Sequence, residues 1–315
     1  MSSFKELLRS SMKSEDTEER VDVYFTRPVG LAFALLWKRL GVHPNAITVL
    51  GMFLGTGAAY MFWHTDTWHN TMGVLLLMSA NFCDSTDGQL ARLTGKTSLT
   101  GRVLDGFSGD LWFFCIYIAI CLRLYGQDMP GTDVHWGIWI FFLAFTAGAL
   151  SHSRQSSLAD YYRQIHLFFL NGDKGSELDD YNRLREIYNK LPRRQWMARV
   201  FYWNYSKYCK SQERRTPKFQ ALIQALRKEK TAHTMTPETL ERLRDEFIAG
   251  SRPLLRHTNF LTFNSRAFCI YATCLAGCPY VYLILEVTLY NIVYIFMRHQ
   301  HESLCSNIQH KYMNA

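Results

Sequence analysis

The sequence predicts an all-α membrane protein, with six transmembrane helices preceded by an interfacial amphipathic helix and a helical cytoplasmic insertion between spans 4 and 5. Two observations predict this fold class. Apolar residues make up 48% of the 315 residues, yet they are concentrated in two blocks, 28–152 and 257–297. The segments outside the blocks are charged, and Lys and Arg are divided unequally between the predicted loops.

The apolar blocks divide into segments of the lengths that a bilayer requires. The first segment, 28–42, is short and contains Lys38 and Arg39, which indicates a helix lying along the membrane interface. The first span, 45–63, has a face of small residues for helix packing, namely Gly51, Gly55, Ala58 and Ala59. The remaining spans are expected at residues 70–93, 100–123, 135–153, 266–277 and 280–297.

Loop charges predict the orientation of these spans. The loops 64–69, 124–134 and 276–281 carry no Lys or Arg, whereas the segments on the opposite side all do. The positive-inside rule therefore places both termini and the insertion in the cytoplasm, and it disfavours a soluble all-α protein. The expected regions are a polar N-terminal segment (1–27), the interfacial helix with spans 1–4 (28–165), the insertion (166–256), spans 5 and 6 (257–298) and a cytoplasmic tail (299–315).

The insertion reads as a set of helices, with caps expected at Ser176 and Thr236. In residues 193–215, Trp and Tyr alternate with Lys and Arg. This pattern suits a surface resting on anionic lipid headgroups, and it suits a small soluble bundle with a solvated basic face equally well. The net charge of +8 follows from the predicted topology. No nucleic-acid recognition motif accompanies it, so membrane lipids, and no nucleic acid, are the expected partners.

Ionisable residues lie where the second span nears the cytoplasm. Asp84, Asp87, Gly88 and Ala91 fall at positions i, i+3, i+4 and i+7, so they share one helix face. Ionisable residues inside a span are costly and usually functional. Two carboxylates on adjacent turns form half of a divalent-metal site, and the small residues leave room for a bulky ligand. Arg92 follows directly and suits a phosphate.

The third span continues the pattern. Gly101 and Asp105 are separated by four residues, so Gly101 clears space on the face where Asp105 adds a third carboxylate. Carboxylate oxygens favour Mg²⁺ or Mn²⁺ over zinc. Such an ion bridges phosphates and neutralises a leaving group in phosphoryl-type transfer. Ser98 stands at the predicted start of this helix and is expected to cap it.

These residues together resemble the signature of the CDP-alcohol phosphotransferase family, over residues 25–165 and 257–300; the insertion lies outside the usual family core. The resemblance implies an integral membrane enzyme of phospholipid synthesis that transfers a substituted phosphate from a CDP-linked alcohol to an acceptor hydroxyl and releases CMP. It also implies a two-ion Mg²⁺ or Mn²⁺ site at the cytoplasmic face and a homodimer. The implied metal ligands are Asp84, Asp87 and Asp105, and the implied cytidine-diphosphate site comprises Asp87, Gly88, Ala91, Arg92 and Gly101.

The sequence departs from the family pattern at the fourth aspartate, which the resemblance implies is the general base and a ligand of the second ion. That residue should follow Asp105 by four positions, but position 109 is Gly and the aspartate is Asp110. On a regular helix Asp110 points about 140° away from Asp105. We expect a one-residue π-bulge or a local unwinding that returns Asp110 to the catalytic face as base and metal ligand. Alternatively, the site has three carboxylates and Asp110 is structural or faces another chain.

The acceptor is predicted from arginines at the cytoplasmic ends of the last three spans. If they converge, they suit an acceptor that is itself a phosphate, such as inositol phosphate, although the positive-inside rule alone also explains them. These arginines are Arg154, Arg256, Arg266 and Arg298. Glu286 and Asn291 in the sixth span are expected to bond to neighbouring helices.

We therefore favour phosphatidyl transfer from CDP-diacylglycerol to a small polar alcohol, with inositol phosphate as the favoured acceptor. One alternative is a CDP-choline or CDP-ethanolamine phosphotransferase that acts on a lipid alcohol. The other is a pseudoenzyme or scaffold that binds the nucleotide lipid without turnover. A cation channel would also place carboxylates within spans, but it does not require the glycine and alanine spacing.

Overall fold

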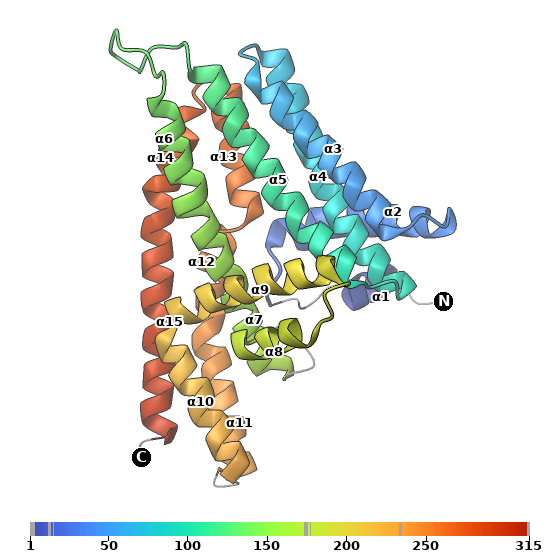
Figure 1. Cartoon of the computed structure of the whole chain (residues 1–315), viewed down its shortest axis with the longest axis vertical. Coiled ribbons are helices and arrows are strands. Elements are labelled where there is room, and N and C mark those ends of the chain that lie inside the picture. The colour runs from blue at the N-terminus through green and yellow to red at the C-terminus, as the bar shows by residue number, and fades with distance from the viewer. Residues whose placement is uncertain are drawn as a thin grey trace. The chain divides into compact units, whose positions relative to one another are not determined.

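The computed structural model describes residues 4–11, 14, 16–172, 176, 178–232 and 235–313. The chain forms two compact units, each built from two separate stretches of sequence (Figure 1). Unit 1 comprises residues 1–153 and 263–289, and unit 2 comprises residues 154–262 and 290–315. Helices form the framework of both units.

Unit 1 holds the segment that carries the predicted motif. Each of its central helices begins at a side-chain cap: His43 accepts from the backbone N–H of Asn45, and Ser98 accepts from that of Gly101, which confirms the predicted cap. The helices are α1 (Phe4–Ser11), the π-helical turn η1 (Asp22–Thr26), α2 (Arg27–Arg39), α3 (Pro44–Trp63), α4 (Thr67–Thr94), α5 (Leu99–Leu124), α6 (Trp139–Phe145), the π-helical η2 (Thr146–His152), α13 (Phe263–Leu275) and α14 (Tyr280–Val287).

Unit 2 contains the insertion and the C-terminal helix. Asp180, rather than the predicted Ser176, caps α8, because its carboxylate accepts from the backbone N–H of Arg183 at 3.0 Å. The predicted cap at Thr236 is confirmed. The helices are α7 (Ser153–Asn171), α8 (Tyr181–Lys190), α9 (Trp196–Arg215), α10 (Pro217–Ala232), α11 (Pro237–Ser251), the 3-10 turn η4 (Arg252–Leu254), α12 (Leu255–Phe260) and α15 (Leu289–Met313).

Among the described residues, three helical stretches are long and apolar enough to cross a membrane. They are Pro44–Trp63, Thr100–Leu124 and Tyr280–Met313, the last of which runs through α14 and α15. These stretches contain the predicted first, third and sixth spans. The other predicted spans are also helical, but α4 carries the motif charges, α13 has only 13 residues and α6 passes into a π-helical stretch. The six-span count therefore stays a prediction.

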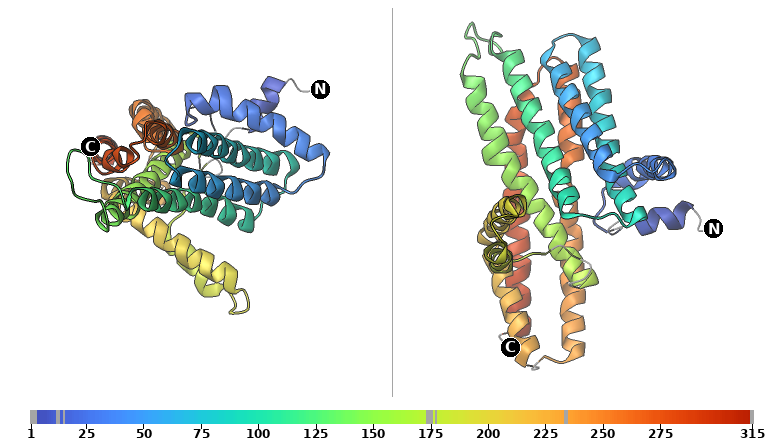
Figure 2. Two further views of the ribbon diagram at one scale, coloured as in Figure 1. Left: turned by 90° about the horizontal axis from the view of Figure 1, so that it is seen from above. Right: turned by 45° about the vertical axis from the view of Figure 1, so that its right-hand side comes forward.

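The helix α3 packs along both α4 and α5 (Figure 2). The predicted small-residue face makes this contact. A Cβ built on Gly51 would lie 3.2 Å from Cβ of Cys83 in α4, and one built on Gly55 would lie 2.2 Å from Cδ1 of Trp112 in α5. Trp112 therefore rests directly on the backbone of α3, which only glycine permits at this position.

The helix α2 corresponds to the predicted interfacial segment and packs on α4. Its inner face buries Leu31 and Ala34, while Phe33 and Leu36 remain exposed. Apolar side chains on an exposed face are expected for a helix that lies at a lipid surface. Gly30 allows the close contact with α4, because a Cβ there would lie 2.6 Å from Oγ of Ser85.

We predict that Gly55→Ala lowers the stability of unit 1. The added methyl group would overlap the indole of Trp112, and overpacking of this kind typically costs about 1–3 kcal/mol. Gly57→Ala is the matched control, since it lies in the same helix and its Cβ would lie 3.7 Å from the nearest atom, Cδ1 of Leu76. Thermal unfolding of the two purified variants in detergent measures the difference. Equal midpoints would show that Trp112 moves aside without cost.

Candidate functional site

Three carboxylates from α4 and α5 face one another in unit 1. The carboxyl groups of Asp84 and Asp105 lie within hydrogen-bonding reach, and Asp105 also acts electrostatically on Asp87. Asp87 is buried, Asp84 is half-buried and Asp105 is exposed. The structure therefore brings the three predicted metal ligands to one place, with Asp105 on its open side.

The start of α3 contacts both halves of this site. The Thr48 hydroxyl donates a hydrogen bond to Oδ2 of Asp87, and both side chains are buried. A Cβ built on Gly101 would lie 3.1 Å from Oδ1 of Asn45, so α3 and α5 approach each other closely at this position. Asn45 and Thr48 both belong to the HPNAIT sequence at the start of α3. Their roles depend on contacts with α4 and α5, so the sequence alone did not assign them.

The guanidinium of Arg92 lies beside the small motif residue Gly88 of α4. A Cβ built on Gly88 would meet first the guanidinium of Arg92, with Nη1 at 3.5 Å. Arg92 is exposed and lies in the electrostatic field of Asp87 and Asp105. Ala91 is half-buried on the same helix. An anion that bridges metal ions and a guanidinium fits this arrangement.

A second guanidinium near the carboxylates comes from the N-terminal segment. Arg27, at the start of α2, acts electrostatically on both Asp84 and Arg92. Glu18 holds this guanidinium in a bidentate pair, with Nε···Oε2 at 3.1 Å and Nη2···Oε1 at 3.0 Å. The sequence prediction missed Arg27, since it was assigned to a polar N-terminal segment outside the motif.

Hydrogen bonds from α4 fix the start of α2. Gln89 Nε2 donates to the Arg27 carbonyl at 3.0 Å, and the Ser85 hydroxyl donates to the Thr26 carbonyl at 3.4 Å. Ser85 and Gln89 are buried and alternate along α4 with the motif residues. One face of α4 therefore presents the carboxylates, while the adjacent face holds the backbone that carries Arg27.

The expected π-bulge after Asp105 is not present. The helix α5 is regular from Leu99 to Leu124, so Asp110 leaves the face of Asp105 by about 140°. Asp110 is exposed and shares its face with Phe113 and Tyr117, which pack against His152 of η2. The prediction of a π-bulge was wrong, because glycines at positions 106 and 109 permit a distorted backbone without requiring one. A regular helix is favoured instead, since each added residue gains a backbone hydrogen bond.

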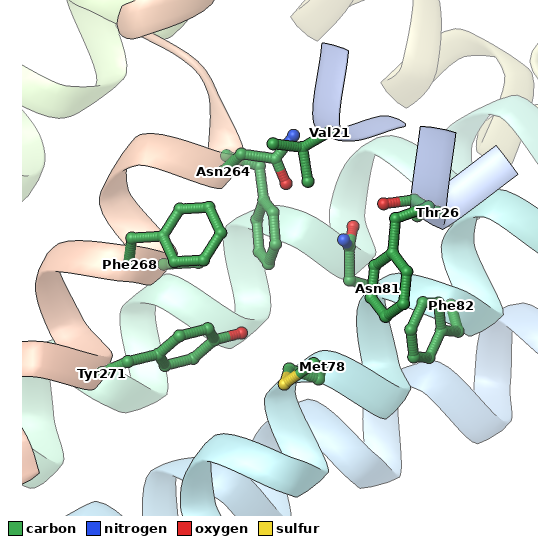
Figure 3. Close-up of a pocket in the computed structure, with 11 residues that line it drawn as sticks. Val21, Thr26, Met78, Asn81, Phe82, Asn264, Phe268 and Tyr271 are labelled. Atoms are coloured by element: carbon green, nitrogen blue, oxygen red, sulfur yellow. The ribbon is translucent and has the colours of Figure 1, made fainter. Parts of the chain in front are cut away.

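A small apolar cavity lies next to the site, between η1, α4 and α13 (Figure 3). Its volume is about 40 Å³. Asn81 lines it one helical turn from Asp84, and Asn264 stands opposite. The Asn264 amide donates to the carboxylates of Glu19 and Asp22 at 2.9 and 3.1 Å, which ties α13 to the N-terminal segment. The lining is otherwise mainly apolar: Val21, Phe25, Met78, Phe82, Phe263, Ala267, Phe268 and Tyr271, with Thr26.

One of the arginines predicted for an acceptor pocket is instead a structural residue. Arg266 is fully buried, and its guanidinium donates two hydrogen bonds to Glu286 through Nε and Nη2 at 3.1 Å. This pair confirms the expectation that Glu286 bonds to a neighbouring helix. The sequence did not assign Glu286 as the partner of Arg266, because loop charge counts do not reveal a carboxylate twenty residues away in the sequence.

The other three arginines belong to unit 2 and are exposed. Arg298 donates through Nε to the carbonyl of Arg215 at 2.9 Å, and Arg215 donates to the carbonyl of Arg154 at 2.8 Å. Arg256 lies at the start of α12. Asn291 accepts a hydrogen bond from Gln155 at 3.0 Å, as expected for a residue that joins two helices. A shared acceptor pocket stays a prediction.

We predict that Arg266→Met strongly destabilises the protein, because it leaves the Glu286 carboxylate buried without its partner. Loss of one member of a buried ion pair typically costs about 3–5 kcal/mol. The double variant Arg266→Met/Glu286→Leu removes both charges and should recover most of the lost stability. Thermal unfolding in detergent compares the two proteins. A double variant no more stable than Arg266→Met alone would contradict this account of the pair.

The comparisons with known proteins match the segment that carries this site. Residues 41–162 match the family model described as CDP-alcohol phosphatidyltransferase. Over 115 residues the chain is 39% identical to an archaetidylinositol phosphate synthase from Pyrococcus horikoshii, and this match covers 36% of the chain and 55% of that relative. The chain thus spans about half the length of the curated relative. Residues 41–162, which contain α3, α4 and α5, are thus similar to the CDP-alcohol phosphatidyltransferase family.

Proposed function

We propose that this protein transfers the phosphatidyl group of CDP-diacylglycerol to a small polar alcohol and releases CMP. The acceptor oxygen attacks the phosphorus that carries diacylglycerol, and the bond between that phosphorus and the bridging oxygen of the diphosphate breaks. The observation that carries the proposal is the meeting of Asp84, Asp87 and Asp105 near Arg92, within a segment that matches the family model.

The donor set fits divalent cations. Carboxylates of the same charge that stand as close as Asp84 and Asp105 repel each other unless a cation or a proton lies between them. Their hard oxygen atoms suit Mg²⁺ or Mn²⁺, and we propose two ions with Asp84, Asp87 and Asp105 as ligands. When bound, the ions neutralise the charge of the diphosphate and of the departing CMP.

The remaining residues of the site position the diphosphate. Thr48 fixes the orientation of the Asp87 carboxylate through its hydrogen bond. Arg92 and Arg27 supply positive charge beside the carboxylates, where phosphate oxygens would lie. Gly88 and Ala91 leave the space in which the cytidine diphosphate approaches the backbone of α4.

The apolar cavity beside Asn81 supports a lipid substrate. Its lining is mainly aromatic and aliphatic, and it begins one turn from Asp84. This position suits the start of an acyl chain whose headgroup is held at the carboxylates. A diacylglycerol acceptor would use the same cavity, so the choice between the two donor branches needs an assay.

We propose inositol phosphate as the acceptor. The support is the name of the relative, archaetidylinositol phosphate synthase. We also propose a homodimer and a site that opens to the cytoplasm, both of which rest on the family resemblance and on the loop charges.

An assay of the purified protein with CDP-diacylglycerol and Mn²⁺ tests the function. We expect CMP release with inositol phosphate to exceed that with inositol, glycerol phosphate or serine, and to stop when EDTA removes the metal. A parallel reaction with CDP-ethanolamine and diacylglycerol should give no CMP. Bound metal and CDP without CMP release from any acceptor would support a pseudoenzyme and overturn the proposal.

The variants Asp105→Asn and Asp110→Asn test the helix geometry of α5. Asp105 faces the other carboxylates, so its loss should reduce CMP release by about 10²-fold or more, the range expected for a group that acts in the chemical step. Asp110 projects away from them, so Asp110→Asn should retain most of the activity. Equal loss in both variants would show that Asp110 reaches the ions and that α5 changes its winding when substrate binds.

A further inference from the structure

The helix α9 of unit 2 has an exposed face that begins apolar and ends basic. Its first two turns expose Trp196 (66%), Met197 (63%), Val200 (52%) and Trp203 (41%). Trp196, Val200, Trp203 and Lys207 follow one another at i, i+4, i+7 and i+11, so they form a single stripe. Exposed tryptophans in such a stripe are unusual for a surface that contacts only water.

The second half of the same stripe is positively charged. Lys207, Lys210 and Arg214 are exposed, and the Lys207 ammonium lies 3.4 Å from the ring centroid of Trp203. Tryptophan beside lysine or arginine is the composition found where a protein meets the headgroup layer of a membrane. The side chains thus offer an apolar part to the acyl boundary and a basic part to anionic headgroups.

The opposite face of α9 is occupied within unit 2. Gln212 donates to the Ser157 carbonyl of α7 at 2.9 Å. Tyr205 donates to Asp179 just before α8 at 3.1 Å. The orientation of α9 about its own axis is therefore fixed, and the stripe is the face that these contacts leave open.

The C-terminal end of α9 contacts α15 at the position where the sequence of α15 changes from apolar to charged residues. The carbonyl of Arg215, the last residue of α9, accepts a hydrogen bond from Arg298 at 2.9 Å. Arg298 is the first charged residue after the apolar start of α15, where Ile292 and Ile295 are exposed as lipid-facing residues would be. The end of α9 is thus held at the predicted membrane boundary.

The direction of the α9 axis relative to α15 bears on how α9 would meet a membrane. It runs across the direction of α15, and α8 lies on the side of α9 nearer the C-terminal half of α15 (Figures 1 and 2). We propose that α9 lies in the membrane surface, with Trp196, Val200 and Trp203 inserted at the acyl boundary and its basic residues bound to anionic lipid headgroups.

A fluorescent amino acid placed at Val200 of the full-length protein tests this proposal in nanodiscs whose lipids carry bromine on their acyl chains. We expect brominated lipid to quench this probe several-fold more than the same probe at Glu186, which is exposed on α8. Similar quenching at the two positions, whether weak or strong, would overturn the proposal. Weak quenching at both would assign the stripe to the solvated face of a soluble bundle.

The lipid composition tests the basic half of the stripe. Quenching at Val200 should increase when anionic lipid is added to zwitterionic nanodiscs and should fall at high salt. The variant Lys207→Glu/Arg214→Glu should lose this dependence on anionic lipid. The matched control Lys228→Glu/Arg242→Glu reverses two exposed basic residues of α10 and α11 and should retain it. The same loss in both variants, or no dependence in the unaltered protein, would contradict binding to anionic headgroups.

Discussion

The contact of α3 with both α4 and α5 is the constraint on which the site depends. Glycine makes this contact possible, because Trp112 of α5 lies directly on the backbone at Gly55. The carboxylates then meet beside the first turns of α3, where Thr48 holds Asp87. A side chain at Gly55 would overlap the indole of Trp112 and disturb the contact of α3 with α5. The packing of the apolar helices therefore determines the distance between charged groups that the sequence separates by about twenty residues.

The charge balance of the site depends on a segment outside the matched family region. Arg27 precedes residue 41, where the family match begins, and its backbone is held by Gln89 of α4. Its guanidinium is held by Glu18. Three carboxylates and two guanidinium groups are thus placed by contacts among η1, α2, α4 and α5. Glu18 partly neutralises the charge of Arg27, so Arg27 contributes less positive charge to the site than a free guanidinium would. A bound phosphate would compete with Glu18 for the Arg27 guanidinium.

The sequence predicted the features that depend on local pattern. Apolar runs located α3, α5 and the stretch that leads into α15, and the spacing of Asp84, Asp87 and Asp105 identified a shared site. The features that it missed depend on pairing over a long distance. Arg266 was assigned to a pocket because it lies near a span end, as three other arginines do, whereas its partner Glu286 becomes visible only when α13 and α14 are placed side by side.

In the family pattern, the third and fourth aspartates lie on neighbouring turns of one helix face. Because α5 is regularly wound, Asp105 and Asp110 of this chain point in different directions. Affinity for a hard cation rises with the number of charged ligands, so a site without a fourth carboxylate binds its ions less tightly unless its ligands are held in place. The Asp87 carboxylate is already oriented by Thr48, and both side chains are buried. Preorganisation of Asp87 would therefore offset the charge that Asp110 takes away from this face, and Asp105 is left as the exposed member of the three carboxylates.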